Sequence, residues 1–220
     1  MFKLLLLLST LCALASSVVA ESLTISGPLR VLDGDTLSIG PVQIRLFGID
    51  APETVQDCAL PDGSEWNCGR SSTRFLANLT EAGDLFCLPV SRDPYGRIVS
   101  TCSVNDVDLS GALIDAGLAW AFVEYSDRYV EREAVARTAE IGVFQAETET
   151  AWEYRANRWQ RAVEASPDGC PIKGNINGAS QINHTPWSPN YAQTRIDTSK
   201  GERWFCDEAE AFTAGWTARR

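Results

Sequence analysis

The sequence predicts a mainly β protein with packed helices, in the α+β class, in which a small barrel carries a cysteine-containing module at its C-terminal end. Three observations favour this fold: strand-like runs separated by turn residues near the N-terminus, helical patterns after them, and cysteines spread along the chain. The 220 residues are 45% hydrophobic and 22% charged, which is ordinary for a globular protein that buries a core.

The first 20 residues indicate a secretory signal peptide. Lys3 precedes an apolar run from Leu4 to about Ala15, and small residues follow as far as Ala20. The apolar run is shorter than the roughly 18 residues that a membrane-spanning helix requires. We therefore expect cleavage before Glu21 and export to the periplasm or the medium, without stable membrane insertion.

Residues 22–145 are expected to form the barrel and its packed helices. Residues 22–49 alternate strand-like runs with turns of Gly, Pro and Asp, which is typical of a β-meander. A helix is expected to begin at Ser71 or Ser72 and to end before Gly83. The other expected elements are strands at about 85–90 and 98–104 and helices at about 109–116 and 129–141.

A linker and a second module are expected after the barrel. We expect residues 146–169 to be a helical linker, and residues 170–220 to be a small, turn-rich module whose role the sequence leaves unassigned. The linker helix, at about 152–165, carries Trp152 and Trp159 seven residues apart. We interpret it as an amphipathic helix with its tryptophans on the barrel. Its basic residues, expected in solvent as an auxiliary basic patch, are Arg155, Arg158 and Arg161.

Six cysteines remain once Cys12 is removed with the signal peptide, and an even number in an exported chain favours disulfides. Six cysteines allow 15 connectivities, of which we favour pairing in sequence order. A structural zinc site is the weaker alternative, because no C-x-x-C pair occurs and the single histidine, His184, has no nearby cysteine cluster. The expected pairs are Cys58 with Cys68, Cys87 with Cys102, and Cys170 with Cys206.

Charge excludes one class of nucleic-acid protein. The formal net charge is -10, so the chain is not a basic protein that coats nucleic acid without sequence preference. Between residues 21 and 150 there are 9 arginines and no lysine against 21 acidic residues. Because there is one histidine, mechanisms that need two are also excluded, and acid-base chemistry falls mainly to carboxylates.

The turn Asp33-Gly34-Asp35 and the later Asp50 are the first candidates for chemistry. The hairpin and returning strand could bring Asp35 and Asp50 together, which concentrates negative charge and favours a hard cation. Ca²⁺ takes 6 to 8 oxygen ligands, including carboxylates, backbone carbonyls and water. Asp35, Asp50 and the backbone carbonyl of Ala51 are the expected ligands. The structural alternative is an ordinary Asp-Gly hairpin turn.

Glu53, Arg45 and Arg97 extend this constellation. Glu53 stands three residues after Asp50 and could handle a proton while Asp50 binds metal. Arg45 lies in an otherwise apolar strand, where a charged residue needs a partner or a ligand. Guanidinium groups match phosphate oxygens in geometry and charge. The set suits phosphodiester hydrolysis, although Arg45 alone could be a barrel ion pair and the segment before Arg97 a simple turn.

These segments, in this order, resemble the staphylococcal nuclease (thermonuclease) family over roughly residues 24–145. The shared motifs are D-G-D-T at 33–36, R-L-x-G-I-D-A-P-E at 45–53, D-x-Y-G-R at 93–97 and G-L-A at 117–119. The resemblance implies a five-stranded OB-fold barrel with about three packed helices. It also implies a calcium-dependent hydrolase that cleaves DNA and RNA and leaves 3′-phosphates.

The resemblance also implies residue roles. Asp35, Asp50 and the Ala51 carbonyl correspond to the calcium ligands. Tyr95 and Tyr125 correspond to positions along the nucleotide pocket, where rings stack on unpaired bases. Three positions depart from the family pattern, because Ala51 replaces a threonine, Pro94 a lysine and Val123 a tyrosine. The residues that correspond to the catalytic set are Arg45, Glu53 and Arg97.

Two other functions remain open from the sequence. The barrel could be a non-catalytic module that binds anionic polymers at the cell envelope. Alternatively, the C-terminal module could anchor the chain to the cell wall, with cleavage secondary. The complete set of arginines and carboxylates favours the nuclease over both.

Overall fold

The computed structural model describes residues 25–218 of the chain. Its main sheet has the order β1-β2-β3-β8-β7, and the short strand β9 pairs with the end of β8. The meander runs antiparallel through the first three strands, β3 pairs in parallel with β8, and β7 pairs antiparallel with β8. The strands are β1 (Leu29–Val31), β2 (Thr36–Ile39), β3 (Val42–Leu46), β7 (Leu85–Arg92), β8 (Ile98–Val104) and β9 (Val107–Asp108).

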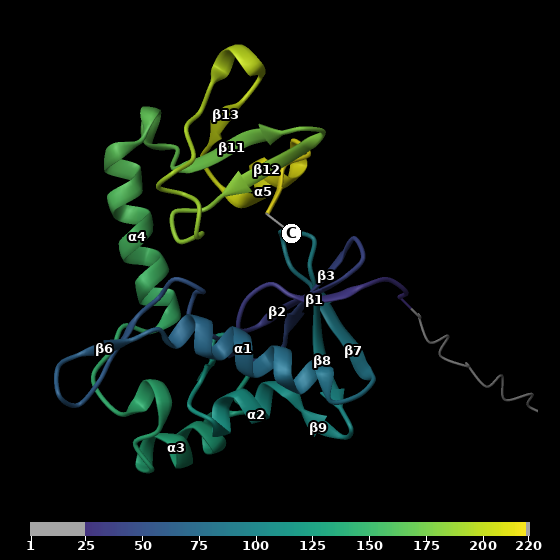
Figure 1. The fold of residues 1–220 in the computed structure, drawn as a ribbon, viewed down its shortest axis with the longest axis vertical. Coiled ribbons are helices and arrows are strands. Elements are labelled where there is room, and N and C mark those ends of the chain that lie inside the picture. The colour runs from purple at the N-terminus through teal and green to yellow at the C-terminus, as the bar shows by residue number, and fades with distance from the viewer. Residues whose placement is uncertain (1–24, 219–220) are drawn as a thin grey trace, which may run out of the picture.

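The sheet curls as the expected five-stranded OB-fold barrel does, with helices α1 and α2 across one end of it (Figure 1). Its core lies between the sheet and these two helices. The side chains at its centre are exposed by at most 1% and are Leu37, Leu46, Leu76, Leu113 and Ile114. The helices are α1 (Cys68–Glu81), α2 (Leu109–Asp115) and α3 (Val130–Thr138), followed by a 3-10 turn at Gly142–Phe144.

Two short strand pairs complete this part of the chain. β4 (Ile49–Asp50) pairs with β10 (Trp120–Ala121), and β5 (Cys58–Ala59) pairs with β6 (Glu65–Trp66). The first pair holds the R-L-x-G-I-D-A-P-E segment next to the buried Trp120, which is 2% exposed. Asp50 is therefore fixed by backbone pairing on a short strand rather than carried on a free loop.

Helix α1 begins three residues before Ser71, so the expected start is wrong. The side chain of Asn67 accepts the backbone N–H of Arg70 at 2.9 Å, which caps the first turn. Serines at 71 and 72 resemble caps in sequence, but Ser72 is buried inside the helix and donates to the Leu118 carbonyl. The cap that the fold uses lies next to the Cys58–Cys68 disulfide.

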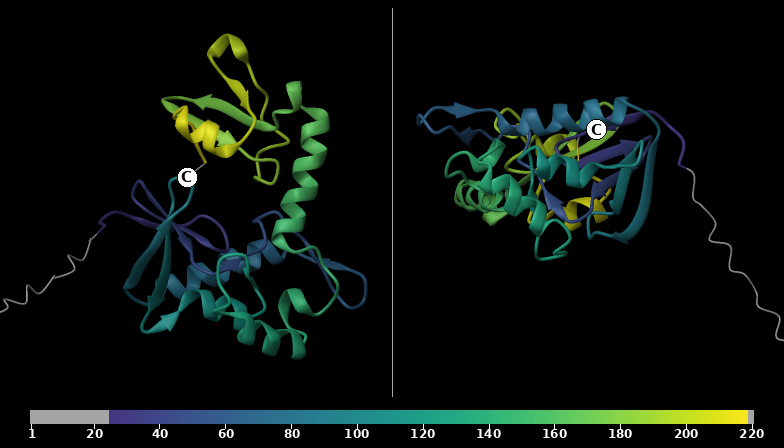
Figure 2. Two further views of the ribbon diagram at one scale, coloured as in Figure 1. Left: turned by 180° about the vertical axis from the view of Figure 1, so that it is seen from behind. Right: turned by 90° about the horizontal axis from the view of Figure 1, so that it is seen from below.

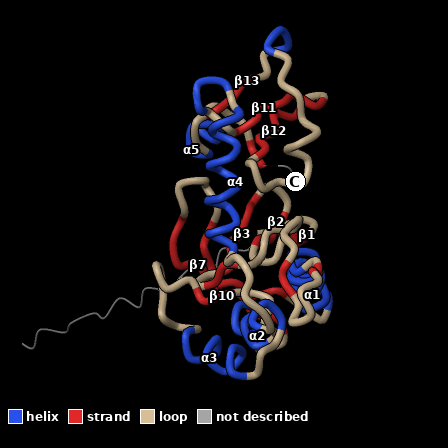
Figure 3. The backbone as a smooth tube through the Cα atoms, turned by 90° about the vertical axis from the view of Figure 1, so that its left-hand side faces the viewer, coloured by secondary structure: helices blue, strands red, loops and turns tan. Residues whose placement is uncertain are grey.

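Helix α4 (Ala151–Ala165) leads from the barrel to the C-terminal module (Figures 1 and 2). It begins with a capping box, in which the Thr150 hydroxyl and the Glu153 carboxylate each accept a backbone N–H of the other residue. Figure 3 shows the helix running between the barrel below and the module above. One side of its first turn therefore faces the barrel.

The C-terminal module is more regular than expected. It is a four-stranded sheet of order β13-β11-β12-β14, in which β12 and β14 are parallel, packed on helix α5. Its small core contains Ile172, Phe205, Ala211 and Trp216, with Trp159 of α4 packed against them. The elements are β11 (Ile172–Asn177), β12 (Ser180–His184), β13 (Arg203–Phe205), α5 (Glu208–Thr213), β14 (Thr217–Ala218) and 3-10 turns at Pro167–Gly169 and Thr198–Lys200.

The six cysteines of the described residues form three disulfides, Cys58–Cys68, Cys87–Cys102 and Cys170–Cys206, which are the expected pairs. Within residues 25–218, none of the helices has the length and apolar character needed to cross a bilayer. The expected signal peptide, residues 1–20, lies outside the described residues, as does most of the first expected strand run.

Candidate active site

The turn between β1 and β2 positions Asp35. The Asp33 carboxylate accepts the backbone N–H of Asp35 at 3.0 Å and shapes the turn. Gly34 is required there, because a Cβ at this position would lie 2.3 Å from the Ser72 hydroxyl oxygen and 2.7 Å from the Ala51 Cβ. Close packing of the turn against α1 thus brings Asp35 beside the segment that follows β4.

Arg45 joins the two predicted metal-binding aspartates. It lies on β3 opposite Thr36, and its Nη1 donates to Asp35 Oδ1 at 3.1 Å while its Nη2 donates to Asp50 Oδ1 at 2.8 Å. The Asp50 side chain is 0% exposed and that of Asp35 6%. Arg45 therefore forms the barrel ion pair that was the structural alternative for this residue. It also lies between the two carboxylates that are expected to bind the metal.

Asp35 accepts further hydrogen bonds that hold it ionised. The Thr36 hydroxyl donates to its Oδ1 at 2.9 Å, and the backbone N–H of Ala51 donates to its Oδ2 at 3.1 Å. Burial by itself raises the pKa of Asp35, but Arg45 and the Ala51 N–H outweigh it and leave that pKa below its ordinary value. Burial and the charge of Asp35 raise the pKa of the neighbouring Asp33 to about 6.

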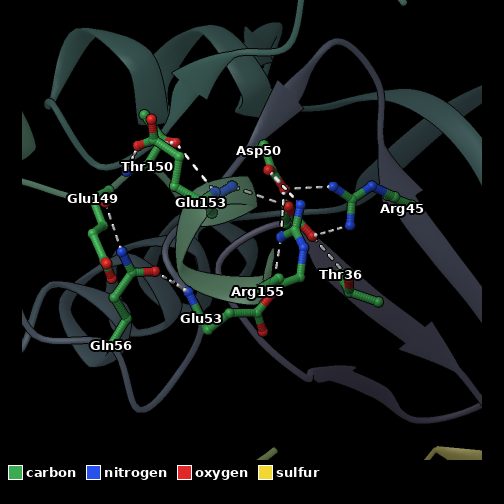
Figure 4. A network of polar contacts seen from close by, with 11 residues as sticks. Thr36, Arg45, Asp50, Glu53, Gln56, Glu149, Thr150, Glu153 and Arg155 are labelled. Carbon is green, nitrogen blue, oxygen red and sulfur yellow. Dashed lines mark hydrogen bonds and ion pairs between the residues drawn. The ribbon is translucent and has the colours of Figure 1, made fainter. Parts of the chain in front are cut away.

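Glu53 lies at the edge of the same group, on the segment after β4. Its backbone N–H donates to the Gln56 side chain at 3.2 Å, and Gln56 in turn donates to the Glu149 carbonyl at 2.8 Å, just before α4 (Figure 4). The start of α1 packs tightly on it, since a Cβ on Gly69 would lie 1.8 Å from the Glu53 carbonyl oxygen. Burial raises the pKa of the Glu53 carboxyl to about 8, although the nearby Arg155 opposes the shift.

Arg97 approaches the site but pairs elsewhere. Its Nε donates to Asp93 Oδ2 at 2.6 Å, and the same aspartate accepts the backbone N–H groups of Tyr95 and Arg97. Its charge still contributes to lowering the pKa of Asp35, so it lies within electrostatic reach. Among the hydrogen bonds of residues 25–218, none joins Arg97 to Arg45, Asp50 or Glu53.

Arg155 of α4 is the residue that sequence reasoning misplaced. Its Nη1 and Nη2 donate to Asp50 Oδ1 and Oδ2 at 3.0 and 2.7 Å, and Nη1 also donates to Glu53 Oε1 at 2.9 Å (Figure 4). Its side chain is 22% exposed. The expectation of a basic solvent face at Arg155, Arg158 and Arg161 is therefore wrong for Arg155. Residues six apart on a helix point about 120° from each other, so Arg155 can face the barrel while Arg161 points away from it.

Trp152 explains why Arg155 points inward. The Trp152 ring stacks on Phe122 at 5.8 Å between centroids and meets Trp120 edge-on at 6.2 Å. Residues three apart on a helix are neighbours on its surface, so this docking turns Arg155 toward β4. The expected docking of tryptophans on the barrel holds for Trp152, whereas Trp159 packs against the C-terminal core. The signal in the sequence was the Trp-x-x-Arg spacing.

The predicted nucleotide-pocket rings are accessible. Tyr95 is 39% exposed, with the Arg97 guanidinium 5.4 Å from its ring centroid, and Tyr125 is 70% exposed and packs on Phe122 at 5.1 Å. Tyr125 therefore belongs to the same aromatic cluster as Trp152. Both rings can receive a planar group from solvent without rearrangement of the core.

Helix α5 of the C-terminal module touches the loop that carries Arg97. A Cβ on Gly96 would lie 2.6 Å from the tip of the Phe212 ring, so the ring rests directly on that glycine. One turn earlier on the helix, burial raises the pKa of Glu208 although Arg97 and Arg155 act against the shift. The module therefore borders the site rather than standing apart from it.

The donor chemistry of Asp35, Asp50 and Ala51 suits a hard cation such as Ca²⁺. Within the described part of the chain, however, no group of three or more Asp, Glu, His or Cys side chains is assembled as a metal centre. Every carboxylate oxygen of the two aspartates already accepts a hydrogen bond from the protein. The residues fit the ion by type, provided that the Arg155 guanidinium moves off Asp50.

Residues 43–146 match the family described as staphylococcal nuclease homologue. The succinoglycan biosynthesis protein ExoI of Rhizobium meliloti (strain 1021) is 33% identical over 140 residues, which cover 62% of this chain and 73% of that protein. An uncharacterized endonuclease of Escherichia coli is 34% identical over 103 residues, 44% of this chain and 61% of the relative. Protein ParB of Escherichia coli is 28% identical over 107 residues, 43% and 55% of the two chains.

Proposed function

The chain belongs to the staphylococcal nuclease family, and from this premise we propose that it is an exported, calcium-dependent nuclease that hydrolyses phosphodiester bonds of DNA or RNA and leaves 3′-phosphates. The observation that carries the proposal is the buried group in which Arg45 contacts both Asp35 and Asp50, with Glu53 at its edge. Buried ion pairs add little to the stability of a fold, so a guanidinium between two buried carboxylates, with a third carboxylate beside them, favours a functional role.

Glu53 is the proposed general base. Its carboxylate would take the proton of the attacking water, whose oxygen forms a bond to phosphorus while the bond to the 5′-oxygen of the next nucleotide breaks. The departing 5′-oxygen takes up a proton and leaves as the 5′-hydroxyl. General-base catalysis of this kind contributes about 10² to 10⁴ in rate. The burial that raises the pKa of Glu53 to about 8 makes it a stronger base than a free glutamate, and its ion pair with Arg155 favours the ionised form.

Arg45 and Arg97 are the proposed charge-stabilising residues. Guanidinium groups aimed at the phosphoryl oxygens stabilise the negative charge that develops as the water attacks. Arg45 is already oriented by Asp35 and Asp50, whereas Arg97 must exchange Asp93 for the phosphate. Asp35, Asp50 and the Ala51 carbonyl would hold Ca²⁺, which when bound neutralises phosphate charge.

Unpaired strands are the proposed substrate. The exposed rings of Tyr95 and Tyr125 offer faces on which bases stack, and stacking is available to bases that are not paired in a duplex. An oxidising compartment is the proposed location, since three disulfides are typical of exported proteins. The disulfides support an enzyme that meets nucleic acid outside the cytoplasm.

Hydrolysis of single-stranded DNA, with Ca²⁺ and with chelator, tests the proposal. Wild type should cleave with Ca²⁺ and lose cleavage with chelator, and Glu53→Gln should lower the rate by about 10² or more. Glu65→Gln is the matched control, because Glu65 is an exposed carboxylate on β6 and the same charge is removed. Equal rates with and without Ca²⁺ for wild type and Glu53→Gln alike would refute the nuclease, and no cleavage at all would favour the binding module.

A further inference from the structure

Arg155 comes from helix α4, outside the segment 43–146 that matches the family. Its guanidinium binds Asp50 in a two-pronged geometry, with one N–H group on each carboxylate oxygen, at 3.0 and 2.7 Å. Such bidentate pairs are the strongest and most directional of charged hydrogen bonds. Asp50 is fully buried, so water does not weaken the pair.

The atoms that Arg155 uses are those that a metal ion would need. A hard cation would bind the Asp50 oxygens, and both of them are directed at the N–H groups of Arg155. The same guanidinium also reaches Glu53 at 2.9 Å, so it covers the side of Asp50 that faces the proposed base. Arg45 shares Asp50 Oδ1 with Arg155, but among the hydrogen bonds of residues 25–218 Oδ2 accepts from Arg155 alone, so an ion at Oδ2 would need the place of that guanidinium. Arg155 and a divalent ion therefore exclude each other at Asp50.

The backbone around Arg155 is held independently of this contact. The capping box fixes the start of α4, the Thr148 hydroxyl accepts the backbone N–H of Ala59 at 2.9 Å, and Trp152 stacks on Phe122. The arginine can swing off Asp50 by rotation about its own side-chain bonds while the helix stays docked. It then remains close to the site and can return as soon as the ion leaves.

We propose that Arg155 is a built-in cation of the Asp50 site, a tethered competitor that Ca²⁺ must displace and that sets how much Ca²⁺ the protein needs. The proposal rests on the calcium site of the proposed function. Apparent affinity equals the intrinsic affinity multiplied by the fraction of molecules whose site is free. If Arg155 is inserted in nine molecules of ten, its removal should tighten Ca²⁺ binding about tenfold.

Calorimetric titration of the full-length protein with CaCl₂, without nucleic acid, measures this directly. Arg155→Gln should bind Ca²⁺ at least about tenfold more tightly than wild type, and Arg155→Lys, which keeps the charge but loses the fork, should lie between them. Arg161→Gln removes the same charge from an exposed position of the same helix and should stay within about twofold of wild type. Asp50→Asn should abolish the binding in either background.

Each outcome decides the matter. Equal or weaker binding by Arg155→Gln, with wild-type melting behaviour, would overturn the proposal, as would an equal gain in Arg161→Gln. If no protein of the series binds Ca²⁺, the proposal also falls. Because the titration involves no turnover, these results stand apart from the nuclease assay. A gain in Arg155→Gln without cleavage of any nucleic acid would keep the competition and refute the nuclease.

Discussion

Arg45 is the side chain that contacts both buried aspartates of the site. The side chains of Asp35 and Asp50 are almost fully buried, and an ionised buried carboxylate destabilises the fold unless it is paired. Asp50 has a second partner in Arg155, whereas Asp35 has Arg45 as its only ion-pair partner within residues 25–218. Asp35 is therefore the residue that depends most on Arg45.

Arg45→Gln should lower the free energy of unfolding by roughly 3 kcal/mol, because removing one partner of a buried ion pair leaves the other charge unpaired. It should also lower the cleavage rate through loss of a charge-stabilising group. Urea unfolding at neutral pH measures the first effect. Arg30→Gln on β1, an exposed strand position, is the matched control and should change stability by less than about 0.5 kcal/mol.

The residues of the D-G-D-T and R-L-x-G-I-D-A-P-E segments could be selected from sequence because motif order places them on neighbouring strands. The pairing of Arg45 with Asp35 and Asp50 follows from that order and from the apolar strand around the arginine. Arg155 could not be selected in this way. Its inward direction depends on Trp152 docking against Phe122, and the Trp-x-x-Arg spacing indicates that direction only once this tertiary contact is known.

At the scale of elements, strands and turns were more predictable than helix ends. The meander strands lie where Gly and Asp turns separate apolar runs. The start of α1 was misplaced because Ser71 and Ser72 have the side chains of good caps, while Asn67 performs the capping. Where several polar residues stand near a helix start, any one of them could be the cap. The hydrogen bond from Ser72 to the Leu118 carbonyl places Ser72 inside the helix and leaves Asn67 as the cap.

Buried charged side chains stabilise the C-terminal sheet, and the composition of the segment does not indicate their contacts. Glu202 is 7% exposed, and its two oxygens accept the backbone N–H groups of Ile176 at 3.0 Å and Asp197 at 2.8 Å. Lys173 of β11, also buried, donates to the Tyr191 and Thr194 carbonyls at 2.8 and 3.0 Å. These two charged residues tie the segment between β12 and β13 to the sheet.

Glu202 makes the stability of this module pH-dependent. The backbone N–H groups of Asp197 and Ile176 lower the pKa of Glu202 below its ordinary value of 4.5. A lowered pKa contributes stability above the unfolded value, and that contribution is lost as pH falls through the folded value. Wild type should therefore melt above Glu202→Gln at neutral pH, and the difference should shrink below about pH 4.5. A difference that stays constant in thermal melts down to about pH 3 would contradict this role.

At the scale of the whole molecule, charge is divided unequally. The acidic excess belongs to the barrel part, which has 9 arginines against 21 acidic residues up to residue 150, and the remainder is close to neutral. A field of this sign repels a polyanion, but salt screens it within about 8 Å at physiological strength. On the proposed function, substrate capture therefore depends on local cations, which are Arg45, Arg97 and the proposed Ca²⁺.

The appended part of the chain, helix α4 and the C-terminal module, contacts the candidate site. Its helix α5 rests on Gly96 through Phe212, and α4 places Arg155 on Asp50, so both appended helices touch the site that the barrel provides. The sequence predicted the barrel and all three disulfides, one of which lies in the C-terminal module, but it described residues 146–220 only as a linker and an unassigned module. The surface of the site is built by both parts of the chain.

In the proposed reaction, water activated at Glu53 attacks phosphorus and releases the 5′-oxygen. Cleavage of a defined single-stranded oligonucleotide in ¹⁸O-labelled water with Ca²⁺, followed by mass analysis of both product ends, measures this most directly. We predict one ¹⁸O atom in a 3′-phosphate and an unlabelled 5′-hydroxyl. An ¹⁸O-labelled 5′-phosphate, an unlabelled 3′-phosphate, or an intact oligonucleotide would contradict the account.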